Sequence, residues 1–199
     1  MSPRTSDARE RMLGSTIALL REYGASATSI DRVLARSGAP RGSVYHHFPG
    51  GRTQLLEEAV VLAGELMGGL IERVVQAEDP LRAVDEFFAG WQRRVAGSDF
   101  RSGCPIVAVV VDPHDDAPQL TRSAGSAFAD WRSAFTALFR RHGVPEDRAR
   151  RLSTLIVAAQ EGGILLCRAE RSIAPLEAVS EELHDLVVHA LRERPAPAP

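Results

Sequence analysis

The sequence is poor in cysteine and contains no lysine. Its two cysteines, Cys104 and Cys167, are too few for a disulfide-rich secreted fold. Neither lies in a Cys-x-x-Cys pair or in a Cys/His pattern with the spacing of a zinc site, so we expect no metal site and no cofactor. Because every basic residue is arginine, we interpret the absence of lysine mainly as the codon bias of a GC-rich genome.

The sequence also lacks an apolar run long enough to cross a membrane. The longest uncharged apolar stretch, about residues 102–111, is far shorter than the roughly 18 residues that a membrane span needs. Residues 1–7 contain no apolar segment of the kind found in a secretory signal. We therefore expect a cytoplasmic protein with reduced thiols and no membrane partner.

The composition is that of a globular protein with an uneven distribution of charge. The chain has 199 residues, of which 44% are hydrophobic and 25% charged, which is typical of one or two folded domains. Residues 1–52 hold eight arginines against four acidic residues, whereas residues 53–199 hold sixteen against twenty-two. A basic N-terminal segment on an acidic body favours a polyanion such as nucleic acid as partner, although chance and ordinary solvated helix faces give the same pattern.

The first fifty residues predict three helices. Apolar residues spaced i, i+4, i+7 indicate a helix over residues 9–23. A capping box, Thr28-Ser-Ile-Asp31, predicts the start of a second helix of about nine residues, which Gly38 ends. A third, short helix is expected over residues 39–47. The Gly-Ala-Pro turn at residues 38–40 is the connector typical of a helix-turn-helix.

The rest of the chain predicts longer helices, over residues 53–77, 81–96, 117–142, 146–168 and 176–194. Residues 106–111 are β-branched, as in a strand, but we expect a short buried helix because the sequence offers no partner strand. The expected fold class is all-α, with a three-helix helix-turn-helix domain over residues 1–52 and a second helical domain over residues 53–194. Residues 195–199, Pro-Ala-Pro-Ala-Pro, predict a disordered tail.

The short third helix carries side chains suited to DNA. Val44 and Phe48 lie four residues apart and are expected to pack on the first two helices, which leaves the intervening side chains outside. Arg41 could reach a guanine edge or a phosphate, and Tyr45 could bond a phosphate oxygen. By themselves, these residues are more typical of the surface of an ordinary helical bundle. The adjacent His46 and His47 point about 100° apart, so they form no metal site.

The segment from Thr28 to Phe48, TSIDRVLARSGAPRGSVYHHF, resembles the N-terminal domain of TetR/AcrR-family transcriptional regulators. The apolar stripe of the first helix extends the resemblance to residues 9–60. The resemblance implies double-stranded operator DNA as a partner, with phosphate contacts from Tyr45 and His47 and base-edge contacts from Arg41 and Gly42. The full set of DNA-binding residues that we predict is Thr28, Arg41, Gly42, Ser43, Tyr45, His46, His47 and Arg52.

One departure from the family pattern affects the residue after the recognition helix. The family commonly has Phe-Pro-x-basic, whereas here an extra glycine gives Phe48-Pro-Gly-Gly-Arg52. The counterpart of Arg52 typically holds a phosphate, so whether Arg52 keeps this contact is left open. The extra glycine, the segment SGCPIVAVV at residues 102–110 and the segment AERSIAPLE at residues 169–177 resemble the LmrA/YxaF-like subgroup.

The subgroup resemblance implies a one-component repressor. Such a protein binds a palindromic operator as a homodimer and is released by a small lipophilic or aromatic ligand. Activation, or binding to DNA only with ligand present, is left open by the residues. For the ligand pocket we predict apolar and aromatic residues with one amide to orient the ligand, although plain core packing is the default alternative for most of them: Met67, Phe87, Trp91, Cys104, Phe128, Trp131 and Gln160. His114 is a further polar candidate.

The last two helices resemble the dimerisation helices of the family, so the resemblance implies that residues 53–194 are a ligand-binding and dimerisation domain with the dimer interface on these two helices. Two glycines, Gly162 and Gly163, interrupt an otherwise apolar helix at a cost of about 1 kcal/mol each, which close helix approach would offset. The alternative is that these stripes pack only within one subunit. The dimerisation residues that we predict share an apolar stripe on one of the two helices: Leu155, Ile156, Ala159, Gly163, Leu183, Leu186, Val187 and Ala190.

Two alternatives depend on Cys104. A thiol-based redox sensor would need a reactive Cys104, but the only other cysteine lies 63 residues away. A Cys104-dependent enzyme is less favoured, because the sequence shows no Ser/His/Asp order and no phosphate-binding loop. We therefore expect that the chain is not an enzyme.

Overall fold

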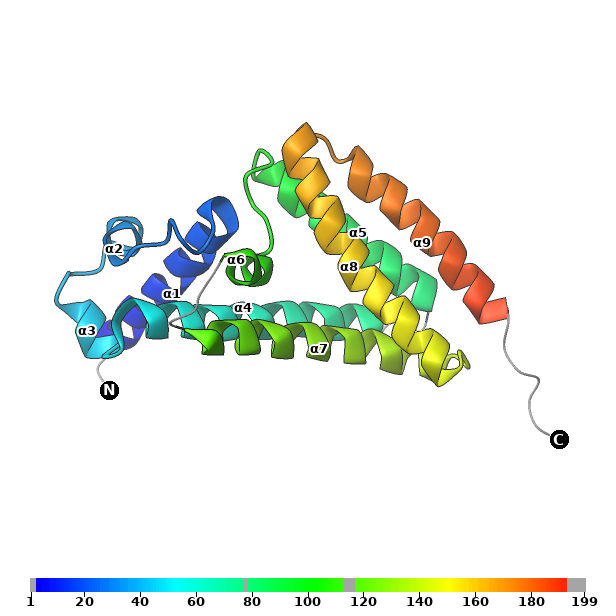
Figure 1. Cartoon of the computed structure of the whole chain (residues 1–199), viewed down its shortest axis with the longest axis horizontal. Coiled ribbons are helices and arrows are strands. Elements are labelled where there is room, and N and C mark those ends of the chain that lie inside the picture. Colours follow the sequence, from blue (N-terminus) through cyan, green and yellow to red (C-terminus); the bar gives the residue numbers. More distant parts are fainter. Residues whose placement is uncertain (1–2, 77–78, 113–116, 193–199) are drawn as a thin grey trace. The chain divides into compact units, whose positions relative to one another are not determined.

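The computed structural model describes residues 3–76, 79–112 and 117–192, and within these ranges it is helical with no strand. The predicted all-α fold class is confirmed. Figure 1 follows the chain from blue to red through the following helices: α1 (Pro3–Tyr23), α2 (Ile30–Ser37), α3 (Ser43–His47), α4 (Gly51–Val75), α5 (Pro80–Gly97), α6 (Pro105–Val111), α7 (Pro118–Arg141), α8 (Glu146–Glu170) and α9 (Ala174–Arg192). His114 and the tail over residues 195–199 lie outside the described residues.

The β-branched run forms the short helix α6, as predicted, and not a strand. Pro105 occupies its first turn, where a missing N–H costs nothing, and the extended Cys104 precedes it. The residues that flank α6 form hydrogen bonds with the end of α1 and with the turn that follows it. The N–H of Gly103 donates to the carbonyl of Arg21 at 2.9 Å, and Asp112 Oδ2 accepts from the N–H of Ser26 at 2.7 Å.

Helix α1 begins at Pro3 and not at residue 9, and the starts of α2 and α3 also differ from the sequence-based prediction. The N-cap of α2 is Ser29, whose side chain accepts from the N–H of Arg32, so the capping box does not begin at Thr28. Helix α3 has five residues and begins at Ser43, not at residue 39 as predicted. Arg41 and Gly42 form a turn before it. Gly38 ends α2 in the left-handed conformation, as predicted.

The helices form two compact units. The first combines α1, α2, α3 and α6 with residues 51–66 of α4 and residues 118–127 of α7. In this unit α1 packs on α2 and α6, and its core includes Met12, Leu20, Val33, Val44 and Phe48. The two units are defined by how compactly their residues pack. The boundary at residue 52 between the DNA-binding domain and the second domain therefore stays a prediction.

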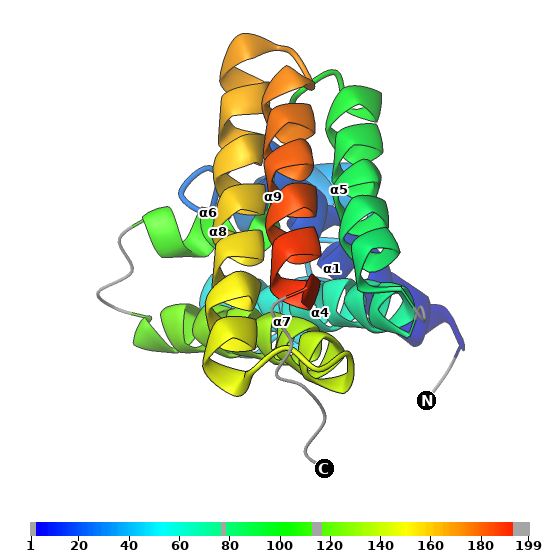
Figure 2. The same cartoon turned by 90° about the vertical axis from the view of Figure 1, so that its right-hand side faces the viewer.

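The second unit combines α5, α8 and α9 with the remaining parts of α4 and α7. Helices α5, α8 and α9 contact one another in pairs and lie side by side in Figure 2. The closest approach is at Gly163, where a Cβ atom would lie 2.7 Å from Leu176 Cδ2. Close packing therefore accounts for Gly163, whereas a Cβ on Gly162 would meet nothing within 4 Å.

Helix α8 has the length and composition of a membrane span, with a mean hydropathy of 1.2 over an 18-residue window. This window is 44% buried, and α8 packs on both α5 and α9. A core helix of a folded domain meets the same criteria, so this property is weak support for membrane insertion.

Candidate nucleic-acid interface and effector cavity

Helix α3 presents one side to the core and the other to solvent. Val44 and Phe48 are fully buried, as their spacing predicts. Between them Tyr45 is 63% exposed and His46 is also exposed, while His47 is half-buried. In the preceding turn Arg41 and Gly42 are exposed and Ser43 is half-buried. The structure thus brings six of the predicted DNA-binding residues onto α3 and the turn before it.

Arg41 is paired with an acidic residue of α2. Its Nη2 donates to Asp31 Oδ1 at 2.7 Å, and the two side chains are 80% and 67% exposed. Such an exposed pair contributes about 0–1 kcal/mol at most, so a phosphate or a base edge could displace Asp31 easily. Ser43 is likewise engaged, since its hydroxyl donates to the carbonyl of Pro40 at 2.6 Å.

Thr28 and Arg52 lie together beneath the start of α2. Thr28 is 1% exposed; its hydroxyl donates to the carbonyl of Gly24 at 2.7 Å and its N–H donates to the carbonyl of Ala25. Both polar hydrogens of Thr28 are therefore already used. A phosphate at this point would meet the first backbone N–H groups of α2, which have no partner within the helix.

Arg52 reaches this turn despite the extra glycine. Its Nε donates to the carbonyl of Thr28 at 2.8 Å and its Nη2 to the carbonyl of Ala25 at 2.5 Å. Arg52 thus ties the start of α4 to the turn before α2 and brings a positive charge to the start of that helix. The structure gives Arg52 a positioning role; its contact with phosphate stays a prediction.

A cavity of about 520 Å³ lies between α4 and α5 in the second unit. Its lining residues come from the last third of α4 and the middle of α5: Met67, Leu70, Val74, Glu86, Phe87, Gly90, Trp91, Arg93 and Arg94. Three of the predicted pocket residues, Met67, Phe87 and Trp91, are on this wall. The charged members were missed from the sequence, although positions 86, 90 and 93 share one face of α5 at helical spacing.

The other predicted pocket residues are not on this wall. Phe128 and Trp131 stack edge to face with ring centroids 5.2 Å apart, and Trp131 is buried. Cys104 is buried in the first unit at the start of α6. Gln160 is fully buried, and neither its Oε1 nor its Nε2 has a hydrogen-bond partner among the described residues. An unpartnered buried polar group costs about 1–3 kcal/mol, which a ligand or a buried water would relieve.

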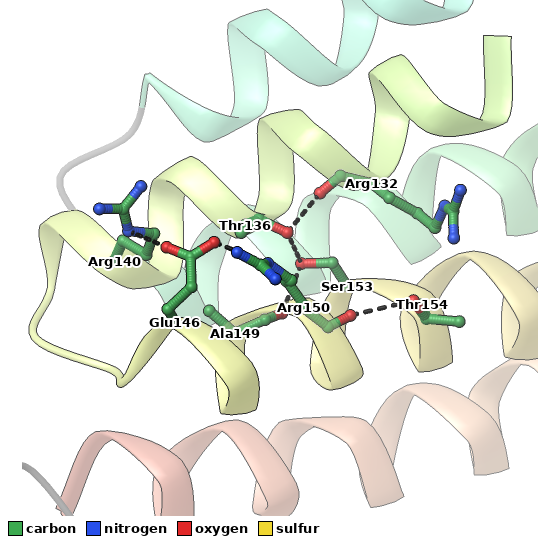
Figure 3. Close-up of polar contacts among 8 residues, drawn as sticks. All are labelled: Arg132, Thr136, Arg140, Glu146, Ala149, Arg150, Ser153 and Thr154. Atoms are coloured by element: carbon green, nitrogen blue, oxygen red, sulfur yellow. Dashed lines mark hydrogen bonds and ion pairs between the residues drawn. The ribbon is translucent and has the colours of Figure 1, made fainter. Parts of the chain in front are cut away.

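A second cavity, of about 410 Å³, lies between α7 and α8 and is predominantly polar. Figure 3 shows its network: Glu146 accepts from Arg140 Nε at 2.5 Å and from Arg150 Nε at 2.7 Å. Thr136 Oγ1 also donates to Ser153 Oγ at 3.0 Å. The lining of the α7–α8 cavity includes three arginines and no aromatic residue. The α4–α5 cavity therefore suits a lipophilic ligand better.

The cysteines lack the surroundings of reactive thiols. Cys104 and Cys167 are both buried and neither forms a disulfide, and they belong to different units. Burial raises the pKa of the Cys167 thiol, which disfavours the nucleophilic thiolate. No cluster of three His, Cys, Asp or Glu side chains that could hold a metal ion occurs within residues 3–76, 79–112 and 117–192.

Most of the predicted dimerisation residues lie in the core of one chain. Ile156, Gly163, Leu183, Val187 and Ala190 are buried, because α8 and α9 pack on each other and on α5. Leu155 is exposed, whereas Ala159 and Leu186 are half-buried.

Helix α8 also has an exposed apolar stripe on a different face. Leu155, Ala159, Gly162 and Leu166 recur at i, i+4, i+7 and i+11, and Leu165 is exposed beside them. Leu155, Leu165 and Leu166 are 42%, 52% and 51% exposed. The helical spacing of Leu155, Ala159 and Leu166 is the sequence signal for this face. We call this set of five residues the α8 stripe.

Both parts of the chain match known protein families. Residues 80–182 match the family described as transcriptional regulator LmrA/YxaF-like, C-terminal domain, and residues 13–59 match bacterial regulatory proteins, tetR family. The chain belongs to the TetR family of transcriptional regulators. The sequence-based assignment to this family and to its LmrA/YxaF-like subgroup is confirmed.

Named relatives span almost the full chain. An uncharacterised helix-turn-helix transcriptional regulator of Mycobacterium tuberculosis is 44% identical over 192 residues, covering 94% of this chain and 97% of the relative. The transcriptional regulator LmrA of Bacillus subtilis is 30% identical over 182 residues, covering 91% of this chain and 97% of LmrA. These TetR-family relatives are transcriptional regulators, so the prediction that this chain is not an enzyme is confirmed.

Solved structures share the fold. A TetR transcriptional regulator from Chloroflexus aurantiacus has a TM-score of 0.79 and 25% identity, covering 94% of this chain and 97% of that one. A cysteine mutant of the TetR-family regulator CifR, complexed with 26-bp double-strand operator DNA, has a TM-score of 0.71 and 17% identity, covering 94% and 96%. This TetR-family chain therefore has an N-terminal helix-turn-helix followed by a helical domain.

Proposed function

We propose that this regulator is a homodimeric cytoplasmic repressor that binds a palindromic operator and is released by a small lipophilic or aromatic ligand. The observation that carries the proposal is the exposed face of α3 and of the turn before it. There Arg41, Gly42, Tyr45 and His46 lie outside the core, while Val44 and Phe48 are buried and hold the helix in place. Side chains fixed in this way can enter a major groove without unfolding their support.

The two kinds of DNA contact come from different residues. Arg41 carries a guanidinium that can bond a guanine edge in two places, and Gly42 has no side chain to obstruct a base. Tyr45 and His47 flank the same face and donate to phosphate oxygens, which set the register of the helix on the duplex. Arg52 supports this arrangement by tying α4 to the turn before α2.

The α8 stripe supports a dimer. An exposed line of leucine, alanine and glycine on one helix is costly in water and matches the closely packed seam of two helices. A two-fold dimer places two α3 helices on the DNA, so its operator is a palindrome whose half-sites follow the same two-fold axis.

Release by ligand depends on α4. This one helix contributes Gly51 and Arg52 at its start and Met67, Leu70 and Val74 to the cavity near its end. A ligand that fits the cavity better when α4 is displaced shifts the population toward forms that bind DNA poorly. A ligand that binds all forms equally leaves operator affinity unchanged.

A thiol-based redox regulator is the second candidate that we considered, and the buried state of both cysteines argues against it. Oxidation of a buried thiol with a raised pKa is slow, because the thiolate is the species that reacts.

The test is selection of bound duplexes from a random library by the purified full-length protein, followed by fluorescence anisotropy over a range of salt concentrations. The proposal predicts an enriched palindrome, with affinity that falls steeply as salt rises. Enrichment of no sequence by folded protein would contradict it, and enrichment of a single unrepeated half-site would contradict the dimer.

A further inference from the structure

We infer that the α4–α5 cavity selects an amphipathic organic anion, with an apolar body against the aromatic wall and an acidic head at the arginines of the rim. This inference deepens the proposed function and takes from it only that the cavity is a ligand site. It names the chemical class of the ligand: an aromatic or aliphatic carboxylate or sulfonate, in preference to a neutral or cationic compound of the same shape.

The inner wall is apolar and rigid. Met67, Phe87 and Trp91 are all buried by their neighbours yet line the cavity. Phe87 is held edge to face by Phe88 and Phe135, with centroids 5.6 and 5.2 Å away. A wall fixed in this way excludes water and favours a flat or extended apolar body, for which a volume of about 520 Å³ is sufficient.

The rim carries an excess of positive charge. Three ionised side chains line the cavity, Glu86, Arg93 and Arg94, and the one carboxylate is already engaged. Glu86 Oε1 accepts from Nε of Arg82 at 2.7 Å, and Arg82 is not itself part of the lining. The negative charge of Glu86 is therefore compensated from outside the cavity, while Arg93 and Arg94 both belong to the lining.

The two arginines differ in how they are held. The guanidinium carbon of Arg94 lies 5.2 Å from the centroid of the Trp91 ring, which fixes the charge beside the aromatic wall. Arg93 is exposed and has no hydrogen-bond or ion-pair partner among the described residues. An arginine without a partner at the edge of an apolar wall is available for a charge-assisted bond to a carboxylate or sulfonate.

The combination selects against other ligands. A cation at this rim meets the positive charge of Arg93 beside a carboxylate that is already engaged, and a neutral ligand leaves the Arg93 guanidinium without a charged partner. An anion gains contacts at the head in addition to those of its body. The acidic head stays at the solvent-exposed mouth, so its desolvation cost is small.

A matched pair of fluorescent probes tests the inference. The probes are 8-anilinonaphthalene-1-sulfonate, an aromatic anion, and N-phenyl-1-naphthylamine, which has the same rings without the sulfonate. Both are titrated against the full-length protein, with quenching of tryptophan emission as the signal for binding close to Trp91. We expect the wild type to bind the anion about tenfold more tightly than the neutral probe.

Three substitutions test which side chains cause the preference for the anionic probe. Arg93→Gln is expected to remove most of the preference for the anion and to leave the affinity for the neutral probe unchanged. Glu86→Gln is expected to increase the affinity for the anion, because it removes the carboxylate from the lining. Arg132→Gln is the matched control: it makes the same charge change at an arginine of the second cavity and is expected to change neither affinity.

Several results would overturn the inference. They are equal affinity for the two probes, absence of binding of the anion, an equal loss of both probes in Arg93→Gln, or a loss of the anion in Arg132→Gln. Operator binding is measured separately on the same samples. An anion that binds at Arg93 but leaves operator affinity unchanged would contradict release by ligand while leaving the selectivity of the cavity intact.

Discussion

Arg171 and Asp99 form an ion pair in which both residues have left-handed backbone. Nη2 of Arg171 donates to Oδ1 of Asp99 at 2.6 Å, and their φ angles are 52° and 54°. The neighbouring Phe100 has a φ of 58°, and its ring lies 5.7 Å from the Arg171 guanidinium. These are the three non-glycine residues with positive φ in the described chain, and they meet where the turn after α5 faces the end of α8.

The left-handed backbone of Arg171 can be separated from its ion pair by two substitutions. Arg171→Gly and Arg171→Val both remove the guanidinium, but only valine is strained at a φ of 52°. We expect Arg171→Val to have a free energy of unfolding about 1–2 kcal/mol lower than Arg171→Gly, measured by urea denaturation. Equal stabilities would show that this turn relaxes without cost.

Gln160 is expected to lower stability for the sake of binding. Gln160→Met keeps the length of the side chain and removes two unpartnered polar atoms from the core, so we expect the ligand-free protein to melt at a higher temperature. Gln160→Glu is the control and is expected to melt lower, because burial of a charge is worse than burial of an amide. A lower melting temperature for Gln160→Met would show that buried water already satisfies the amide.

The sequence predicted which helices form but not what covers each face. The helix over residues 106–111 was predictable because no strand partner exists, and the burial of Val44 and Phe48 followed from their spacing. The dimerisation residues stay a prediction, since an apolar stripe looks the same in the sequence whether it packs within a chain or between chains. Ile156 and Val187 proved to be core, whereas Leu165 is exposed.

The roles of the charged and capping residues were also not predictable from the sequence. Arg93 and Arg94 look like an ordinary solvated face until the aromatic wall beside them is known. Thr28 and Ser29 are both good caps, and Ser29 caps α2 while the Thr28 hydroxyl donates instead to the carbonyl of Gly24, four residues earlier. The reach of Arg52 across the extra glycine also depends on folded geometry that no local pattern contains.

The α8 stripe predicts a substitution that separates the subunits. Leu166→Glu places a charge in the proposed seam, so we expect a monomer by light scattering with its helical content unchanged. Val61→Glu is the matched control, because Val61 is 44% exposed on α4 and lies outside the stripe. A dimer that persists in Leu166→Glu would place the interface elsewhere.

The cysteines are expected to be inert. In native protein at mildly alkaline pH, iodoacetamide should modify neither Cys104 nor Cys167, because both are buried and the pKa of Cys167 is raised by burial. A raised pKa keeps the thiol protonated to higher pH, so reactivity should appear only as pH rises further. Mass spectrometry of the intact protein checks this, with urea-unfolded protein as the positive control. Rapid modification of Cys104 would restore the redox hypothesis.

Tyr45 tests the recognition surface. Tyr45→Ala is expected to weaken operator binding by about tenfold or more without a change in melting temperature, because the side chain is 63% exposed and contributes little to the core. Tyr45→Phe separates the effect of the hydroxyl, for which we propose a phosphate contact, from the effect of the ring. Wild-type affinity in Tyr45→Ala would remove α3 from the DNA interface.

The most direct measurement of the central claim is the stoichiometry and affinity of the full-length protein on the selected duplex, by sedimentation and anisotropy. The account predicts two chains on each duplex, with half-sites arranged as a palindrome and much weaker binding to a duplex in which one half-site is scrambled. One chain on each duplex, or equal affinity for the intact and scrambled sites, would contradict it.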